Sequence, residues 1–321
     1  MVQDAPRLLQ ATARSIIVAQ QRLGLVVLWM TGALLSFSVS AVAIRALATK
    51  LTTFEILSIR SGFGLAVLLL IVAWLPELRK ELALRRMGLH IVRNGIHFVG
   101  TYTWTLALTL LPFATVFALE FTMPMWVALL AVPLLGEHMT VSRLGSIVLG
   151  FLGVLVIVRP GFSSFQPMAL LVLMAAFAFA LSLIATKMLT ATVSTFAIIF
   201  WMNLMQLPMG LAGSDPLFLT RLDWGLALPA FALGAAGLTS HYCLTNAFRV
   251  GDASVVVPLD FLRIPLIALV GWVFYGEALD VFVFAGAALI IGGVLWNLHA
   301  ESRRPGPPTG LGPEKAAAAD A

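Results

Sequence analysis

Two carboxylates lie inside long apolar stretches of this 321-residue chain, and they are the side chains best suited to chemistry. Glu120 falls in the run 113–135 and Asp260 in the run 253–275. A charge within a membrane-length apolar segment costs roughly 2.5–3.5 kcal/mol on insertion scales, so it needs a partner, a proton or a wet cavity. We expect the two carboxylates to bind a proton or a cationic substrate group. The alternative is a structural ion pair, because Arg263 follows Asp260 at the i+3 position of one helix face.

Three arginines also fall inside apolar segments, namely Arg60, Arg93 and Arg263. A guanidinium presents a planar fork of donors that suits the carboxylate or phosphate group of a substrate. The same groups suit pairing with Glu120 or Asp260 to close a gate. Snorkelling to the membrane interface is the other interpretation of the first two arginines. All three are therefore candidate substrate-binding or coupling residues.

Aromatic and amide side chains gather in two further apolar segments. Tyr102 and Trp104 lie in one of them, and Tyr242 and Asn246 lie in the other. Such side chains suit a pocket for a planar or amphipathic solute. The alternative is hydrogen bonding between helices, which contributes about 0.6 kcal/mol on average in membranes. These four residues complete the set of candidate site residues.

The elements that position these residues follow from composition. Apolar residues make up 60% of the chain, charged residues 11%, and the mean hydropathy is +0.99. A soluble domain usually has about a quarter of its residues charged, and about 20 apolar residues in a helix span a bilayer. The sequence therefore predicts an all-α integral membrane protein with ten transmembrane helices. The predicted spans are 23–44, 54–75, 88–110, 113–135, 141–158, 167–189, 194–213, 224–248, 253–275 and 281–299.

The formal charge of +5 does not indicate a nucleic-acid partner. No Lys/Arg stripe is interleaved with aromatic residues on a polar face. Lys and Arg instead fall in short loops, 13 on the side of the termini and four on the other side. The positive-inside rule then places both termini in the cytoplasm of a multi-pass plasma-membrane protein, here expected to be a bacterial inner membrane. The four residues of the other side are Arg45, Lys50, Arg159 and Arg221.

The chain matches itself at a shift of 140 residues, with ten identities in the 36 positions from 102 to 137. Glu120 stands opposite Asp260 in this alignment. The match indicates two units of five spans, and an odd number of spans inverts the second unit in the membrane. Inverted repeats are typical of alternating-access transporters, although duplication kept only for stability is the alternative. The matched pairs include Tyr102 with Tyr242, Leu119 with Leu259, Phe121 with Phe261, Gly136 with Gly276 and Glu137 with Glu277.

These motifs carry a family resemblance. The segment 119–124 leading to Gly136-Glu137, and the segment 259–277 ending in Gly276-Glu277, resemble the EamA-type members of the drug/metabolite transporter superfamily. The resemblance covers roughly residues 23–299. It implies a carrier of two inverted five-helix repeats, usually an exporter or exchanger of amino acids, nucleoside-like compounds, vitamins or drugs. The implied organisation is a cytoplasmic segment 1–22, repeats at 23–160 and 163–299, and a disordered cytoplasmic tail at 300–321.

The expected function is therefore secondary transport of a small polar or amphipathic metabolite, with a proton as a candidate coupling ion. A zwitterion such as an amino acid, or an aromatic amphiphile such as a flavin or nucleoside, suits the mixture of charges. A facilitative permease or channel without ion coupling is the alternative. A membrane enzyme is a remote one, because no Gly-x-Ser-x-Gly or His-Glu-x-x-His motif is present.

The expected partners are the substrate and the lipid bilayer, without nucleic acid and without a required oligomer. Cys243 is the only cysteine, so no disulfide within the chain and no cysteine metal cluster is expected. We also expect no cofactor and no catalytic residue.

Overall fold

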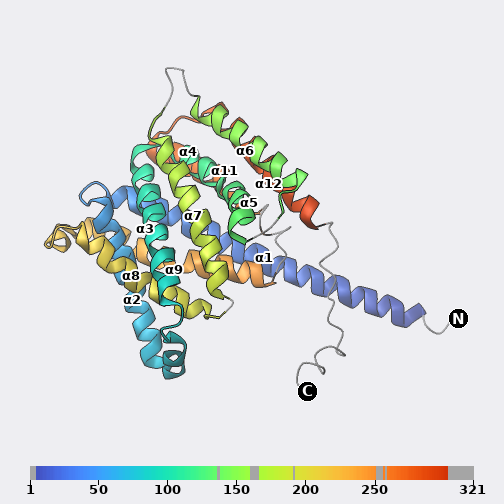
Figure 1. The fold of residues 1–321 in the computed structure, drawn as a ribbon, viewed down its shortest axis with the longest axis horizontal. Helices are drawn as coiled ribbons and strands as arrows, with labels where there is room; N and C mark the ends of the chain where they lie inside the picture. The colour runs from blue at the N-terminus through green and yellow to red at the C-terminus, as the bar shows by residue number, and fades with distance from the viewer. Residues whose placement is uncertain are drawn as a thin grey trace.

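The computed structural model describes residues 5–135, 138–159, 166–190, 192–250, 256 and 259–302, and the regular elements of these residues are all helical. They form a bundle with the long helix α1 projecting beyond it at the N-terminal end (Figure 1). The α-helices are α1 (Ala5–Leu47), α2 (Thr53–Trp74), α3 (Met87–Leu110), α4 (Phe113–Glu120), α5 (Met123–Leu135), α6 (Val141–Val158), α7 (Ala169–Thr190), α8 (Thr195–Ala212), α9 (Trp224–Val250), α11 (Arg263–Tyr275) and α12 (Val281–Ser302). The short 3-10 helices η1 (Pro76–Leu82) and η2 (Phe218–Arg221) lie in two loops.

Seven helical stretches in the described residues are long and apolar enough to cross a membrane. Helices α3 and α9 are as long, at 24 and 27 residues, but they are outside those seven. Helix α11 is apolar but has only 13 residues. The multi-pass helical fold predicted from composition is thus found, and the count of ten spans stays a prediction. The seven stretches are Leu23–Leu47, Thr53–Trp74, Phe113–Leu134, Val141–Val158, Ala169–Thr190, Thr195–Ala212 and Val281–Ala300.

Two predicted segments differ in detail from the structure. The span predicted at 23–44 is the later part of one continuous helix that begins at Ala5. The span predicted at 113–135 is divided into α4 and α5 by a turn at Phe121 and Thr122. The Leu119 carbonyl oxygen accepts both the side-chain hydroxyl of Thr122 at 2.7 Å and the Thr122 N–H at 3.1 Å, which stabilises the turn. The tail predicted at 300–321 begins too early, because α12 continues to Ser302. Residues 303–321 and the Gly136-Glu137 step lie outside the described residues.

Helices α6 and α12 lie side by side along one edge of the bundle (Figure 1). Glycine permits this approach, because a Cβ atom at Gly153 would lie 2.6 Å from the Gly286 carbonyl oxygen. A Cβ atom at Gly286 would in turn lie 2.5 Å from the Gly153 carbonyl oxygen. Small residues that bring backbones together are a common means of helix association in membranes. The close packing expected from the glycines of these two segments is therefore present.

The remaining long helices pair across the chain. Helix α1 packs along α9, α3 along α7, and α2 along both α8 and α9. Helices α2 and α8 converge where α2 begins and α8 ends, since a Cβ at Gly210 would lie 2.5 Å from the Ser58 hydroxyl oxygen. The opposite ends of these two helices enclose a cavity with α9. Helices α2 and α8 are thus in close contact at one end and separated by the cavity toward the other.

Candidate functional site

The break between α4 and α5 has a counterpart before α11. A turn at Phe261 and Leu262 separates Asp260 from the start of α11, and it lies 140 positions after the turn at 121–122. The rings of Phe121 and Phe261 meet edge to face, with centroids 4.8 Å apart. Each turn tightens the backbone, since the N–H groups of Thr122 and Leu262 donate to the carbonyl oxygens three residues earlier. Irregular points in membrane helices are where carriers commonly bind polar groups. The two positions aligned by the repeat are therefore in contact.

A charged cluster joins these two breaks. Arg263 donates to a Glu120 carboxylate oxygen at 3.2 Å and to an Asp260 carboxylate oxygen at 2.5 Å. The indole N–H of Trp104 donates to the second Glu120 oxygen at 2.7 Å. The structure thus brings together four of the sequence-predicted site residues. The pair that the i+3 spacing allowed is formed, and Glu120 joins it from another helix.

Aromatic rings pack on the flat faces of the Arg263 guanidinium, in addition to the carboxylates that contact its N–H groups. Its side chain is 5% exposed, and its guanidinium carbon lies 4.1 Å from the centroid of the Phe37 ring and 5.1 Å from that of Phe121. Stacking of this kind stabilises a cation where water is scarce. With two carboxylates to one guanidinium, the cluster carries a surplus negative charge when both acids are ionised. One Asp260 oxygen has no hydrogen-bond partner in the described residues, so it is an unused acceptor.

The cavity between α2, α8 and α9 has a volume of about 600 Å³. Its residues on α2 run from Arg60 to Ile71, and those on α8 start at Thr195, so it extends away from the tight end of these helices. Its walls are mainly apolar, including Phe63 and Ile199. This shape suits the body of an amphipathic solute.

Arg60, His241 and Tyr242 are the cavity residues with ring or guanidinium groups able to donate hydrogen bonds. Arg60 makes no hydrogen bond or ion pair with any other described residue, unlike Arg263. His241 lies against the Phe37 ring with centroids 6.3 Å apart, and the same ring covers Arg263. The cavity therefore borders the charged cluster through a single aromatic side chain.

The other predicted site residues lie apart from the cluster. Arg93 is 8% exposed and bridges α3 to α7 by donating to the Thr186 hydroxyl at 3.1 Å, so it is buried rather than snorkelling. Tyr102 packs on Phe54 with ring centroids 4.7 Å apart. Asn246 donates to the carbonyl oxygen of the preceding helical turn at 2.8 Å. None of Arg93, Tyr102 and Asn246 is among the residues that line the cavity.

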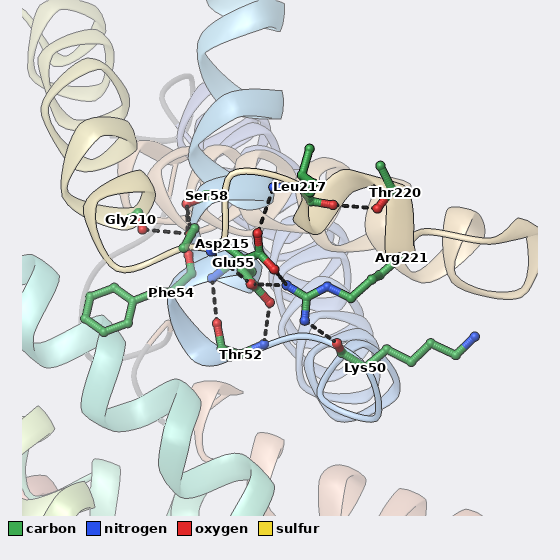
Figure 2. A network of polar contacts seen from close by, with 11 residues as sticks. Lys50, Thr52, Phe54, Glu55, Ser58, Gly210, Asp215, Leu217, Thr220 and Arg221 are labelled. Carbon is green, nitrogen blue, oxygen red and sulfur yellow. Dashed lines mark hydrogen bonds and ion pairs between the residues drawn. The ribbon is translucent and has the colours of Figure 1, made fainter.

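An ion-pair network covers the tight end of α2 and α8 (Figure 2). Glu55 is 1% exposed, closes a capping box with Thr52, and pairs with Arg221 from η2. Arg221 also reaches a carboxylate oxygen of Asp215 at 3.4 Å and the Lys50 carbonyl oxygen at 3.4 Å. Residues near position 50 are thereby fastened to residues near position 220.

The same end carries further pairs. Lys50 pairs with Asp223, and hydrogen bonds from Lys50 and from the Leu226 N–H lower the pKa of this aspartate. Arg45 pairs with Glu277 and also donates to the carbonyl oxygens of Leu108 and Leu111 at 2.8 and 2.7 Å.

Glu277 completes that contact by accepting the Phe113 N–H at 2.8 Å. Asp280, which lies three residues after Glu277, pairs with Arg159. We call this region the ion-paired end, defined by Arg45, Lys50, Glu55, Arg159, Asp215, Arg221, Asp223, Glu277 and Asp280.

The EamA-like transporter family matches this chain twice, at residues 24–159 and 166–298. The chain belongs to that family. The resemblance predicted from the sequence motifs, and with it the drug/metabolite transporter superfamily, is confirmed. The EamA-like chain is therefore a multi-pass membrane transporter of small metabolites and not an enzyme.

Named relatives of this EamA-like chain cover most of its length. It is 28% identical to an S-adenosylmethionine uptake transporter of Rickettsia prowazekii, over 86% of this chain and 92% of the relative. It is 32% identical to a riboflavin transporter of Rhizobium johnstonii, over the same shares of the two chains. A pseudopaline exporter of Pseudomonas aeruginosa is 28% identical over 80% of this chain and 89% of its own. A crystal structure at 20% identity has the same fold, with a TM-score of 0.58 over 87% of this chain and 98% of the other.

Sequence reasoning missed several polar contacts. His97 is buried and contacts the Gln206 amide at 2.8 Å and the Thr101 hydroxyl at 3.2 Å, which ties α3 to α8. The partners of Glu55 and Arg45 were also not foreseen. The sequence did contain signals for two of these contacts. His97 follows the polar residues His90, Arg93 and Asn94 in one apolar segment, and Thr52 and Glu55 have the spacing of a capping box. The partners on distant helices left no local signal.

Proposed function

We propose that this protein is an alternating-access secondary transporter that moves a small polar or amphipathic metabolite across a bacterial inner membrane. The observation that carries the proposal is the contact between two repeat-equivalent helix breaks, each bearing a carboxylate, with Arg263 between them. Broken helices that meet near the middle of the bundle suit a site for substrate or coupling ion.

Two inverted repeats of five spans, at 23–160 and 163–299, are part of the proposal. The contact of Gly153 with Gly286 is related by the 140-residue shift to that of Gly293 with Ser146, where a Cβ would lie 3.0 Å from the carbonyl oxygen. The two family matches fall on the same two stretches. Packing of α1 on α9 and of α3 on α7 is likewise what a two-fold relation would produce.

The proposed conformation is open toward the cytoplasm. The distribution of Lys and Arg assigns the chain termini to the cytoplasm. The first residues of α1 and the last residues of α12 lie away from the ion-paired end, so that end faces the outside. The ion-paired end closes the outer side, while the cavity extends from Arg60 toward the end where α2 finishes and α8 begins. Separation of the Glu55–Arg221 and Arg45–Glu277 pairs would then accompany opening to the outside.

Proton coupling through Glu120 and Asp260 completes the proposal. Protonation of one acid would leave the other to neutralise Arg263, so the cluster can exist in two charge states without an unpaired cation. An uncoupled permease is the second candidate, favoured if Arg263 keeps both acids ionised throughout the cycle.

Counterflow in proteoliposomes tests the function. Relatives are named for S-adenosylmethionine and riboflavin, so these are the first labelled solutes to offer, followed by an amino-acid mixture. A carrier gives saturable uptake that is accelerated by unlabelled solute inside. Flux that rises linearly with concentration and shows no such acceleration would identify a channel instead.

A further inference from the structure

The inner end of the cavity holds a cation without a protein partner. Arg60 lies on α2, less than two helical turns after Phe54, where α2, α8 and α9 all contribute to the cavity wall. Its guanidinium makes no hydrogen bond or ion pair with the described residues. No Asp or Glu is among the described residues that line the cavity. The acids of the neighbouring cluster are already engaged, since Arg263 contacts both Glu120 and Asp260.

An unpaired guanidinium beside apolar walls is unfavourable unless an anion or water reaches it. The cavity wall approaches the head group closely, because a Cβ at Gly237 would lie 3.1 Å from the Arg60 Nε. A larger residue there would push on the arginine, so glycine leaves its fork accessible from the cavity. The geometry presents planar donors at one end of a mainly apolar cavity.

The remaining walls suit an apolar or aromatic body rather than a small hydrated ion. Phe63 packs edge to face on Phe231 with centroids 5.5 Å apart, and Leu68 and Ile199 continue the wall. Asn203 and Thr239 line the cavity, but the Asn203 amide donates to the Ile199 carbonyl oxygen at 2.9 Å and Thr239 bonds to Ser36 at 2.9 Å. His241 and Tyr242 remain as neutral donors, and Arg60 supplies the permanent positive charge among the described residues of the lining.

We propose that this cavity binds an amphiphilic organic anion, with its carboxylate or phosphate on Arg60 and its apolar body against α2, α8 and α9. This rests on the proposed function and adds the substrate class to it. A guanidinium recognises such groups through two parallel hydrogen bonds, which a neutral solute of the same shape lacks. Selectivity for the anion then follows from one side chain.

Equilibrium binding in phosphatidylcholine nanodiscs tests the proposal independently of flux. Riboflavin and its 5′-phosphate share one fluorescent ring system and differ only by the anionic group. We expect the wild type to bind the phosphate ester about tenfold more tightly than riboflavin, the size of a hydrogen bond to a charged group. S-adenosylmethionine and its decarboxylated form make the same comparison for a carboxylate.

The variant Arg60→Gln should abolish the preference within each pair, and Arg60→Lys should retain part of it. Lys80→Gln removes one exposed cation, paired only with Glu77, and serves as a charge-matched control that keeps the preference. A preference that survives Arg60→Gln, or equal binding within both pairs by the wild type, overturns the proposal. So does an absence of binding by both riboflavin 5′-phosphate and S-adenosylmethionine, the two probes that carry a phosphate or carboxylate.

A lipid phosphate offers the same chemistry as a soluble anion. Nanodiscs that contain phosphatidylglycerol separate the two sources, because a lipid occupant would weaken binding of the riboflavin phosphate in the wild type but not in Arg60→Gln. Unchanged binding assigns the site to a soluble anion. Failure of counterflow with intact anion-selective binding would count against the transport mechanism and leave this site standing.

Discussion

Arg263 and Arg60 both lie in membrane-length apolar segments, yet their surroundings are opposite. Arg263 is 4% exposed, contacts two carboxylates, and packs against the Phe37 ring. Arg60 lines a cavity and contacts no acid in the described residues. A cation with partners on two helices holds the protein together, whereas one without a partner is available to a ligand. The comparison separates charges that serve structure from charges that serve recognition.

The largest effect is expected at the paired arginine. Arg263→Gln leaves Glu120 and Asp260 facing each other without a cation, and loss of one partner of a buried pair costs about 3–5 kcal/mol. Thermal or denaturant unfolding in detergent measures this loss. Adding Glu120→Gln and Asp260→Asn to the same variant should recover part of the stability. A single variant as stable as the wild type would remove the cluster from the structural framework.

A smaller effect is expected at one of the acids. Glu120→Gln keeps a hydrogen-bond acceptor for Trp104 and leaves Asp260 to neutralise Arg263, so we expect a loss of about 1–2 kcal/mol. If this carboxylate carries the coupling proton, counterflow by the variant should become independent of pH. The wild-type pH profile, measured in parallel, is the reference. An unchanged profile in the variant would contradict coupling through this residue.

The ion-paired end should respond more weakly still. Arg221 has 37% of its side chain exposed, so Arg221→Gln should cost about 1 kcal/mol, between the values for exposed and buried pairs. The difference from the wild type should shrink in about 1 M salt, which screens exposed charges. The Arg263→Gln deficit should persist in the same salt. Equal salt sensitivity of the two variants would show that burial does not distinguish them.

The smallest change in stability is expected at the unpaired arginine. Arg60→Gln removes no hydrogen bond or ion pair with the described residues, so the free energy of unfolding should stay within about 0.5 kcal/mol of the wild type or rise. The same unfolding assay measures it without added solute. A loss as large as that of Arg263→Gln would mean that Arg60 has a structural partner after all.

Much of the fold could be predicted because the signals are local. Apolar runs of membrane length predicted the helices, and the 140-residue repeat drew attention to Glu120 and Asp260 together. The i+3 spacing from Asp260 allowed the pair with Arg263, which the structure forms. These features depend on neighbouring positions or on similarity between two stretches, and both are visible in one sequence.

The rest depends on contacts between distant segments. The sequence left Trp104 between a solute pocket and a hydrogen bond between helices, and could not name Glu120, 16 positions away, as the acceptor of its indole N–H. Arg45 was counted only as a loop charge, but it pairs with Glu277, 232 positions away. Prolines such as Pro124 and Pro265 indicated kinks in the fourth and ninth segments, but they did not give the position of the turns at 121–122 and 261–262. Only packing decides which arginine finds a partner.

The glycine contact between α6 and α12 limits where movement can occur. Backbones that touch at Gly153 and Gly286 leave no layer of side chains to slide or rotate against one another. We expect these two helices to keep their mutual position and to act as a fixed frame. Rearrangement would then be confined to the other helices, and a cross-link between α6 and α12 should leave turnover intact.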